Sequence, residues 1–180
     1  MSEKEKVDIY LVAGFNGVGK TTYINEFLKN LTGTVAVIQN ELGEVELQFE
    51  AGESQCVMGG CVCCSLQAEL VGVLMQYAIF EKMNNIVVEL PSTAKLSSVI
   101  ELCRTLEKKR NGNFDIHTVD IIDAGRFGSH LRNFGEFYTD QLQYADSVIL
   151  TRMDGLAEKK QEFLEEKLQE LAANATRTVR

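Results

Sequence analysis

The sequence predicts one α/β domain in which a mainly parallel sheet carries helices on both faces. Two observations lead to this prediction: short apolar segments alternate with longer amphipathic segments, and a glycine-rich turn separates the first two of them. Alternation of this kind implies right-handed crossover connections, which bring successive strands into one parallel sheet. A chain of 180 residues can fill one core of this type but not two, so a single domain is expected over 1–180.

Strands are expected at the apolar runs, and helices where apolar residues recur at intervals of three or four. Buried strands are predicted at 7–13, 34–39, 85–90, 118–123 and 147–150, and residues 174–180 look like the start of another strand. Helices are predicted from the glycine loop to Gly33, from Ser65 to about Lys82, around 96–106 and over 157–172. Residues 40–60 show no clear period and are expected to form a long irregular segment, which in a compact domain usually serves function.

Composition and charge exclude several classes of function. The net charge of −8 argues against a nucleic-acid binder, which needs clustered Lys and Arg to contact the phosphate backbone. No apolar run reaches the length that crosses a bilayer, and the polar start, Met1–Lys6, lacks the apolar core of a signal peptide. A cytoplasmic protein without a membrane partner is therefore expected. In that compartment the five cysteines are expected to be thiols or metal ligands rather than disulfides.

The phosphate-binding pattern of P-loop NTPases, G-x-x-x-x-G-K-[ST], is matched by Gly14-Phe15-Asn16-Gly17-Val18-Gly19-Lys20-Thr21. An apolar strand precedes this segment and an amphipathic helix follows it, which favours a nucleotide site over a chance glycine-rich turn. Lys20 is expected on the β and γ phosphates and Thr21 on Mg²⁺. The residues predicted to bind the nucleotide here are Gly14, Asn16, Gly17, Val18, Gly19, Lys20, Thr21 and Thr22.

A second Mg²⁺ ligand is expected at the end of a neighbouring strand, where Glu89 follows the apolar run 86–88. The carboxyl ends of parallel strands line the ligand crevice, which favours Glu89 as a metal ligand over a plain surface carboxylate. Lys20, Thr21 and Glu89 are therefore the residues expected to act in catalysis. Lys20, Mg²⁺ and the loop amides would stabilise charge on the transferring γ-phosphoryl group.

The base of the nucleotide is expected to contact Asp154, which follows the apolar strand 148–150. A carboxylate there can accept hydrogen bonds from both N–H groups on the guanine edge, whereas adenine presents the wrong pattern. The segment Thr151-Arg152-Met153-Asp154 is similar to the guanine-specificity motif [NT]-K-x-D, with Arg152 in place of Lys. A plain loop or helix-cap aspartate is the alternative. The hypothesis is GTP rather than ATP, with Thr151, Arg152 and Asp154 around the base.

Three cysteines within four residues, Cys61, Cys63 and Cys64, form the second motif. Thiolates are strong ligands for Zn²⁺, Co²⁺ or Cu⁺, and three of them leave one tetrahedral position for another ligand. Candidates for that position are Glu41, Glu44 and Cys56. A redox-sensing or merely buried cluster is the alternative, but two adjacent thiols plus a third suit one metal ion better than a disulfide switch. Cys103, on the apolar side of its helix, is expected in the core, and the isolated His117 and His130 are expected to be structural.

Together these motifs resemble the CobW-like GTPases, relatives of the hydrogenase and urease nickel-insertion GTPases. The resemblance covers most of the chain. Gly14–Thr22 is similar to the family P-loop GFLGSGKTT, Asn40–Glu44 to its NEFGE switch segment, Gly60–Cys64 to its GCxCC signature, Ile121–Ala124 to its VVDA strand end, and Gln141–Asp154 to its QL…AD…NKxD stretch.

The resemblance implies a GTPase that uses GTP/GDP and Mg²⁺, binds Zn²⁺ or Co²⁺, and delivers the ion to a client metalloprotein or assists maturation of a corrinoid enzyme or of cobalamin. Related GTPases often dimerise when loaded, so it also implies a homodimer. The family's usual C-terminal domain has no counterpart in 1–180, which leaves a short variant and a fragment open. Ser92, after Pro91, stands where the family has the glycine that senses the γ-phosphate, so switch movement and hydrolysis are expected to be altered.

Two other functions compete with a metal-linked GTPase of slow turnover. The first is a nucleotide-gated metal carrier or scaffold that hydrolyses little, which Ser92 favours. The second is a kinase acting with ATP or on a small molecule, in which the cysteine cluster would have no role.

Overall fold

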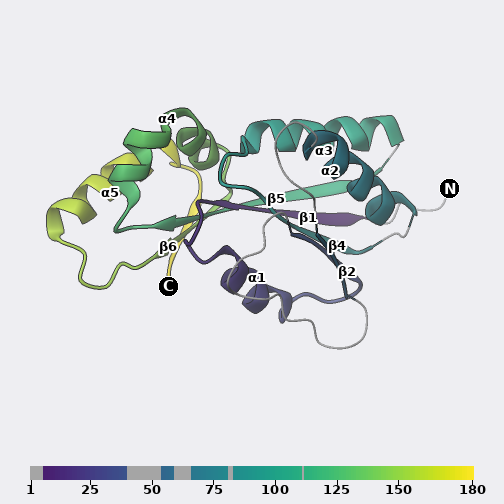
Figure 1. Ribbon diagram of the computed structural model, residues 1–180, viewed down its shortest axis with the longest axis horizontal. Helices are drawn as coiled ribbons and strands as arrows, with labels where there is room; N and C mark the ends of the chain where they lie inside the picture. Colours follow the sequence, from purple (N-terminus) through teal and green to yellow (C-terminus); the bar gives the residue numbers. More distant parts are fainter. Residues whose placement is uncertain (1–5, 40–53, 59–65, 81–82, 111) are drawn as a thin grey trace.

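The computed structural model describes residues 6–39, 54–58, 66–80, 83–110 and 112–180 (Figure 1). Seven strands in this part of the chain form one sheet in the order β3-β2-β4-β1-β5-β6-β7, and every neighbouring pair is parallel. The predicted fold class, a P-loop-type α/β domain with a parallel sheet, is confirmed.

From β3 onwards, helical segments and strands alternate along the chain. In chain order they are β1 Val7–Gly14, α1 Lys20–Leu28, β2 Val35–Gln39, β3 Ser54–Met58, α2 Leu66–Met75, the π-helical turn η1 Gln76–Phe80, β4 Asn85–Glu89, α3 Leu96–Arg110, β5 Phe114–Asp123, α4 Phe127–Gln143, β6 Ser147–Thr151, α5 Glu158–Leu171 and β7 Thr176–Val179.

The helices lie on both faces of the sheet because the chain reverses its direction across it. From β1 the chain moves through α1 towards β2, and from β3 onwards it moves back across the sheet through α2, α3 and α4. Right-handed crossovers in opposite directions place their helices on opposite faces. Figure 1 shows this result, with α1 on one side of the sheet and α2, α3 and α4 on the other, and α5 packs beside α4.

The core follows from the position of β1 in the middle of the sheet. Its alternate residues Ile9, Leu11 and Ala13 pack with apolar residues of α2 and α3, whereas Val12 belongs to the cluster that includes Ile24 of α1. Strands that are covered on both faces contain runs of apolar residues, and such runs allowed β1, β4 and β6 to be predicted from the sequence. Burial of one such Leu or Ile side chain contributes about 1.5–3 kcal/mol to folding.

Two elements were not predicted. The segment 40–60 was expected to be irregular throughout, but 54–58 form the edge strand β3, which pairs only with β2. An edge strand has one neighbour and needs no long apolar run, so its sequence gives a weak signal. Helix α4 was missed because glycines interrupt it, at Gly128 and at the kinked Gly135, and because its core contacts are largely aromatic, from Phe127 and Tyr138.

The other element boundaries differ by smaller amounts. Helix α1 ends at Leu28 rather than at Gly33, and the helix expected to continue to about Lys82 changes to π-helical geometry after Met75. The strand expected to start near Asn174 is confirmed as β7. Within the described ranges, every helix is too short or too polar to span a lipid bilayer.

Candidate nucleotide site

The glycine loop joins β1 to α1 at the carboxyl edge of the sheet, and its backbone needs glycine at specific positions. Gly14 has φ +131°, and a β-carbon there would come within 2.6 Å of the carbonyl oxygen of Ile121 on β5. Gly19, immediately before α1, has φ +103°. Both conformations are strained for residues with a side chain. The loop therefore closes tightly against β5, as a phosphate-binding loop must.

Lys20 is the first residue of α1, and its side chain folds back over the loop. The Nζ donates hydrogen bonds to the carbonyl oxygens of Gly14, at 2.9 Å, and Phe15, at 3.4 Å. The residue is only 6% exposed. The loop carbonyls thus hold a buried ammonium at the position that the phosphate-binding pattern assigns to its lysine. Of the other loop residues, Val18 is buried while Asn16 and Gly17 are exposed, and Thr22 is exposed on the first turn of α1.

The two predicted Mg²⁺ ligands lie together. Thr21 follows Lys20 in α1, and Glu89 is the last residue of β4, the strand next to β1. The Thr21 hydroxyl donates a hydrogen bond of 3.2 Å to Oε1 of Glu89. Glu89 is 4% exposed, so its carboxylate is buried beside α1. Thr21 and Glu89 are 68 positions apart in the sequence, and the pairing of β1 with β4 brings them into contact.

The segment after β6 is anchored to the glycine loop. The Thr151 hydroxyl donates to the carbonyl oxygens of Ile122, at 3.1 Å, and Val18, at 3.3 Å. Arg152 has φ +56°, and its Nη2 donates to the carbonyl oxygen of Gly17 at 2.9 Å. Its Nη1 forms an ion pair with Asp123 at the end of β5. Thr151 and Arg152 thus hold the base-side segment against the phosphate-side loop.

Asp154, the predicted guanine contact, is exposed in the loop between β6 and α5. It lies two residues beyond Arg152, which is hydrogen-bonded to the glycine loop. The structure therefore groups the loop, Lys20, Thr21, Glu89, Thr151 and Arg152 around one edge of the sheet, with Asp154 in solvent beside them.

Asp120 is a buried carboxylate that sequence reasoning missed. It lies on β5 beside Ala13 of β1, it is fully buried, and neither carboxylate oxygen makes a well-formed hydrogen bond among the described residues. Burial raises its pKa to about 7, although the positive charge of Lys20 opposes the shift. The only sequence signal was one acidic residue inside the otherwise apolar run Thr118–Ile122.

Aromatic residues of α4 support the glycine loop from the side. Phe15 stacks on the His130 ring, with centroids 4.9 Å apart, and also contacts the rings of Phe134 and Tyr138. Partial burial lowers the pKa of His130. This contact fits the expectation that His130 is structural. Through these contacts, helix α4, which was not predicted from the sequence, packs against the glycine loop.

The nucleotide-binding domain of CobW, HypB and UreG proteins matches residues 8–178, nearly the whole chain. The chain belongs to this family. It is 29% identical over 171 residues to the zinc chaperone YjiA of Escherichia coli K12, covering 88% of this chain and 54% of that protein. It is 28% identical over 193 residues to the zinc chaperone CobW of Pseudomonas aeruginosa, covering 87% and 51%. The chain thus spans about half the length of these curated relatives.

Solved structures agree with the fold of this CobW/HypB/UreG domain. The crystal structure of Zn(II)-bound YjiA GTPase from E. coli superposes with a TM-score of 0.67 at 24% identity, over 97% of this chain and 57% of that one. HypB from Helicobacter pylori in complex with nickel gives a TM-score of 0.52 at 16% identity, over 97% and 79%. At these identities the likeness concerns the fold alone.

The loop after Glu89, where this CobW/HypB/UreG domain has Pro91 and Ser92, is held from α4. Gln141 donates from Nε2 to the carbonyl oxygens of Ser92, at 3.2 Å, and Ala94, at 3.0 Å. The backbone N–H of Ala94 closes a turn onto the carbonyl oxygen of Pro91 at 2.9 Å. These bonds fix the carbonyl groups of the loop close to the predicted metal ligand Glu89.

The predicted soft-metal ligands Cys61, Cys63 and Cys64, with Glu41 and Glu44, lie outside the described residues. Cys56 lies on β3, where its backbone is in register with Val37 of β2. Cys103 is fully buried on α3, and burial raises the pKa of its thiol to about 12, which confirms its assignment to the core. Of the residues predicted for the site, those assigned to the nucleotide lie within the described ranges.

Proposed function

We propose that this domain binds GTP with Mg²⁺, hydrolyses it slowly, and couples its nucleotide state to Zn²⁺ or Co²⁺ bound at Cys61, Cys63 and Cys64. The observation that carries the proposal is the packing of the Lys20 ammonium onto the glycine-loop carbonyls beside the Thr21–Glu89 pair. A buried cation and a hydroxyl–carboxylate pair at the carboxyl edge of one parallel sheet suit a metal-bound triphosphate.

Lys20 is the residue that would neutralise the phosphate chain. In the structure its Nζ donates to the carbonyl oxygens of Gly14 and Phe15, which hold the ammonium over the loop. A phosphate entering the loop brings acceptors with full negative charge, which bind an ammonium more strongly than neutral carbonyls do. Because the site is already dry at Lys20, the same charge would also stabilise the transition state for transfer of the γ-phosphoryl group.

Thr21 and Glu89 are the residues that would hold Mg²⁺. Hydroxyl and carboxylate oxygens are the hard ligands this ion prefers, and the two oxygens, 3.2 Å apart, already have nearly the spacing of adjacent ligands on an octahedral ion, about 2.9 Å. When bound, Mg²⁺ supplies charge that neutralises the β and γ phosphates. Asp154 would accept the guanine N–H groups, with Arg152 and Thr151 fixing the backbone that carries it.

The metal half of the proposal rests on the cysteine motif and on the relatives. Two curated relatives are named zinc chaperones, which favours Zn²⁺ over Co²⁺ as the cargo. Glu41, Glu44 or Cys56 would complete the coordination of the ion. We infer a client metalloprotein as the acceptor, with a corrinoid enzyme as the alternative client, a cytoplasmic location and a homodimer in the loaded state.

A nucleotide-gated metal carrier with little hydrolysis is the second candidate function. The Pro91–Ser92 loop favours it, because Gln141 fixes this loop from α4 and proline restricts its backbone. A switch loop that is held in this way would respond weakly to the γ-phosphate. Nucleotide binding would then control metal affinity without rapid turnover.

Steady-state phosphate release separates the two candidates. We expect GTP turnover well above ATP turnover, dependent on Mg²⁺, changed by Zn²⁺, and abolished in Lys20→Ala but not in Lys29→Ala at the exposed end of α1. Tight GTP binding with no turnover, with or without Zn²⁺, would favour the carrier. Equal turnover of ATP and GTP would contradict guanine recognition by Asp154.

A further inference from the structure

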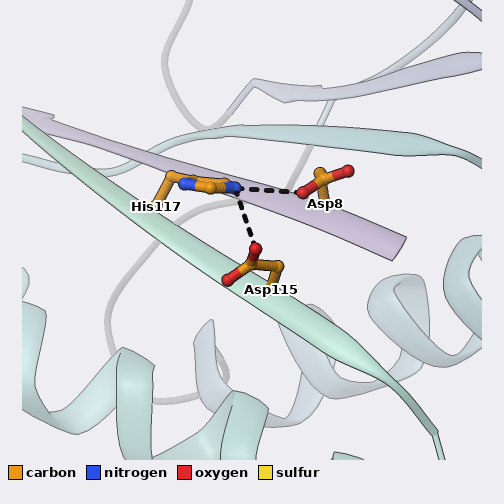
Figure 2. Close-up of side chains that lie close together, drawn as sticks. All are labelled: Asp8, Asp115 and His117. Carbon is orange, nitrogen blue, oxygen red and sulfur yellow. Dashed lines mark hydrogen bonds and ion pairs between the residues drawn. The ribbon is translucent and has the colours of Figure 1, made fainter. Parts of the chain in front are cut away.

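The pairing of β1 with β5 brings three side chains of metal-binding types together near the amino ends of these two strands, which we call the amino edge of the sheet. Asp8 is in register with Asp115, and Tyr10 with His117, so these side chains share one face of the sheet. Figure 2 shows the His117 ring, held on β5, with its Nε2 directed towards Asp8 on one strand and Asp115 on the other. Asp8 and His117 are 109 positions apart in the sequence.

The distances suit one small divalent cation. Nε2 of His117 lies 3.0 Å from Oδ1 of Asp8 and 3.8 Å from Oδ2 of Asp115, and all three ligand atoms lie within 4.8 Å of one another. Two ligand atoms on a tetrahedral Zn²⁺ ion are about 3.3–3.6 Å apart, given bonds of about 2.0–2.2 Å. The two distances from Nε2 therefore lie within a few tenths of an ångström of the tetrahedral spacing.

The histidine ring is held in place by aromatic neighbours. Tyr10 stacks on His117 with centroids 4.7 Å apart and an interplanar angle of 18°, and the edge of Tyr10 meets Phe27 of α1. Stacking of this kind fixes the ring plane, so Nε2 already faces the carboxylates. It donates its proton to Asp8 in the structure, and metal binding requires that proton to move to Nδ1 or to solvent. Fixed ring orientation is a property of built metal sites, where supporting contacts position the ligands.

A lysine side chain already occupies the space between the carboxylates. The Lys6 ammonium lies 2.7 Å from Oδ2 of Asp115 and 3.4 Å from Oδ1 of Asp8. Lys6 is half-exposed and lies just before β1, so it can swing into solvent and leave both carboxylates to another cation.

We propose that Asp8, Asp115 and His117 form a second divalent-cation site, for which Zn²⁺ is the best-suited ion, with Lys6 as a tethered competitor. One imidazole and two carboxylates are a donor set for a borderline ion, and they leave a fourth position for water or for a ligand from a partner. The site lies at the opposite end of β1 from the glycine loop, six residues or about 20 Å away. It is therefore independent of the nucleotide site and does not rest on the proposed function.

The two histidines of the chain give a direct readout, because only His117 belongs to the proposed site. Imidazole signals in an NMR titration with Zn²⁺ should shift for His117 and remain in place for His130, after the cysteines are saturated. The Asp115→Asn variant should weaken this binding by about tenfold or more, since loss of a ligand costs at least as much as loss of its support. Unchanged His117 signals, or equal shifts in Asp115→Asn, would overturn the proposal.

The role of Lys6 provides a second, independent arm. Lys6→Met removes the competing ammonium and should tighten Zn²⁺ binding at His117, whereas Lys108→Met, at an exposed position on α3, should not. If the cluster served only as an internal ion pair, Lys6→Met would leave Zn²⁺ affinity unchanged, which would contradict the proposal. Both lysine positions are exposed, so neither variant is expected to disturb folding.

Discussion

The two edges of the sheet hold their charged side chains in different ways. At the carboxyl edge, Lys20, Glu89 and Asp120 come from three different elements and are almost fully buried. At the amino edge, Asp8, Asp115 and His117 come from two neighbouring strands and stay half-exposed. Charges in a dry crevice interact strongly, whereas charges in contact with water are screened.

The difference separates two kinds of ligand site on one sheet. The buried edge suits a ligand that is enclosed, such as a nucleotide with its metal, because enclosure strengthens every electrostatic contact. The half-exposed edge suits an ion that exchanges with solvent, because its ligands are screened and one competing cation is already present. If this contrast is correct, substitutions at the buried edge should have larger effects than substitutions at the other.

The largest effect is expected from Lys20→Ala. Truncating one member of a desolvated charge pair costs about 2–5 kcal/mol, so GTP affinity should fall by the corresponding factor. A fluorescent GTP analogue measures the affinity, and circular dichroism shows whether the domain is folded. Lys29→Ala is the matched control on the same helix. A folded Lys20→Ala protein that still binds GTP tightly would contradict the assigned role.

Asp120→Asn should change the pH dependence of stability. The folded-state pKa of Asp120 is raised to about 7 from an ordinary 3.8, because burial disfavours the charged form. A raised pKa contributes stability that is complete below about pH 4 and is lost as pH rises through 7. Asparagine does not titrate, so the stability of the variant relative to the parent should increase by about 3 kcal/mol between pH 5 and 8.

Chemical denaturation of both proteins across that pH range, without nucleotide, tests this prediction. Asp115→Asn at the exposed edge is the control, because screening there leaves little pH-dependent stability to remove. A constant difference between Asp120→Asn and the parent from pH 5 to 8 would show that Asp120 is already ionised in the folded protein at pH 5, which would contradict the raised pKa.

A smaller effect is expected from Asp154→Asn, since Asp154 is exposed and its proposed role is confined to the base. Loss of a bidentate base contact costs about 1–3 kcal/mol, so the preference for GTP over ATP should fall and xanthosine triphosphate should gain. Competition binding with the three nucleotides measures this shift. An unmodified protein that already binds ATP and GTP equally would refute the base assignment.

Much of the fold was predictable because its signals are local. Most residues of β1, β4 and β6 are buried on both faces, so each strand contains a run of apolar residues. Edge strand β3 and the aromatic, glycine-interrupted helix α4 have no such run or period, and only tertiary packing defines them.

The nucleotide site was predictable for the same reason, since Gly14–Thr22 are contiguous and Glu89 and Asp154 follow recognisable strands. Asp120 and the Asp8–His117 pair depend on strand register, which no local pattern encodes. The anchoring of Thr151 and Arg152 to the glycine loop also required the structure, although the motif containing them did not.

Coupling between nucleotide and metal is best measured in the His117→Ala variant. This substitution removes the second proposed ion site, so the measured Zn²⁺ binding is that of the cysteines. Zn²⁺ is titrated calorimetrically into nucleotide-free protein and into protein loaded with a non-hydrolysable GTP analogue and Mg²⁺. We predict tighter Zn²⁺ binding in the loaded state, with Zn²⁺ raising affinity for the analogue by the same factor, because coupling in binding free energy is reciprocal. Identical Zn²⁺ affinities in the two titrations would contradict a nucleotide-controlled metal carrier.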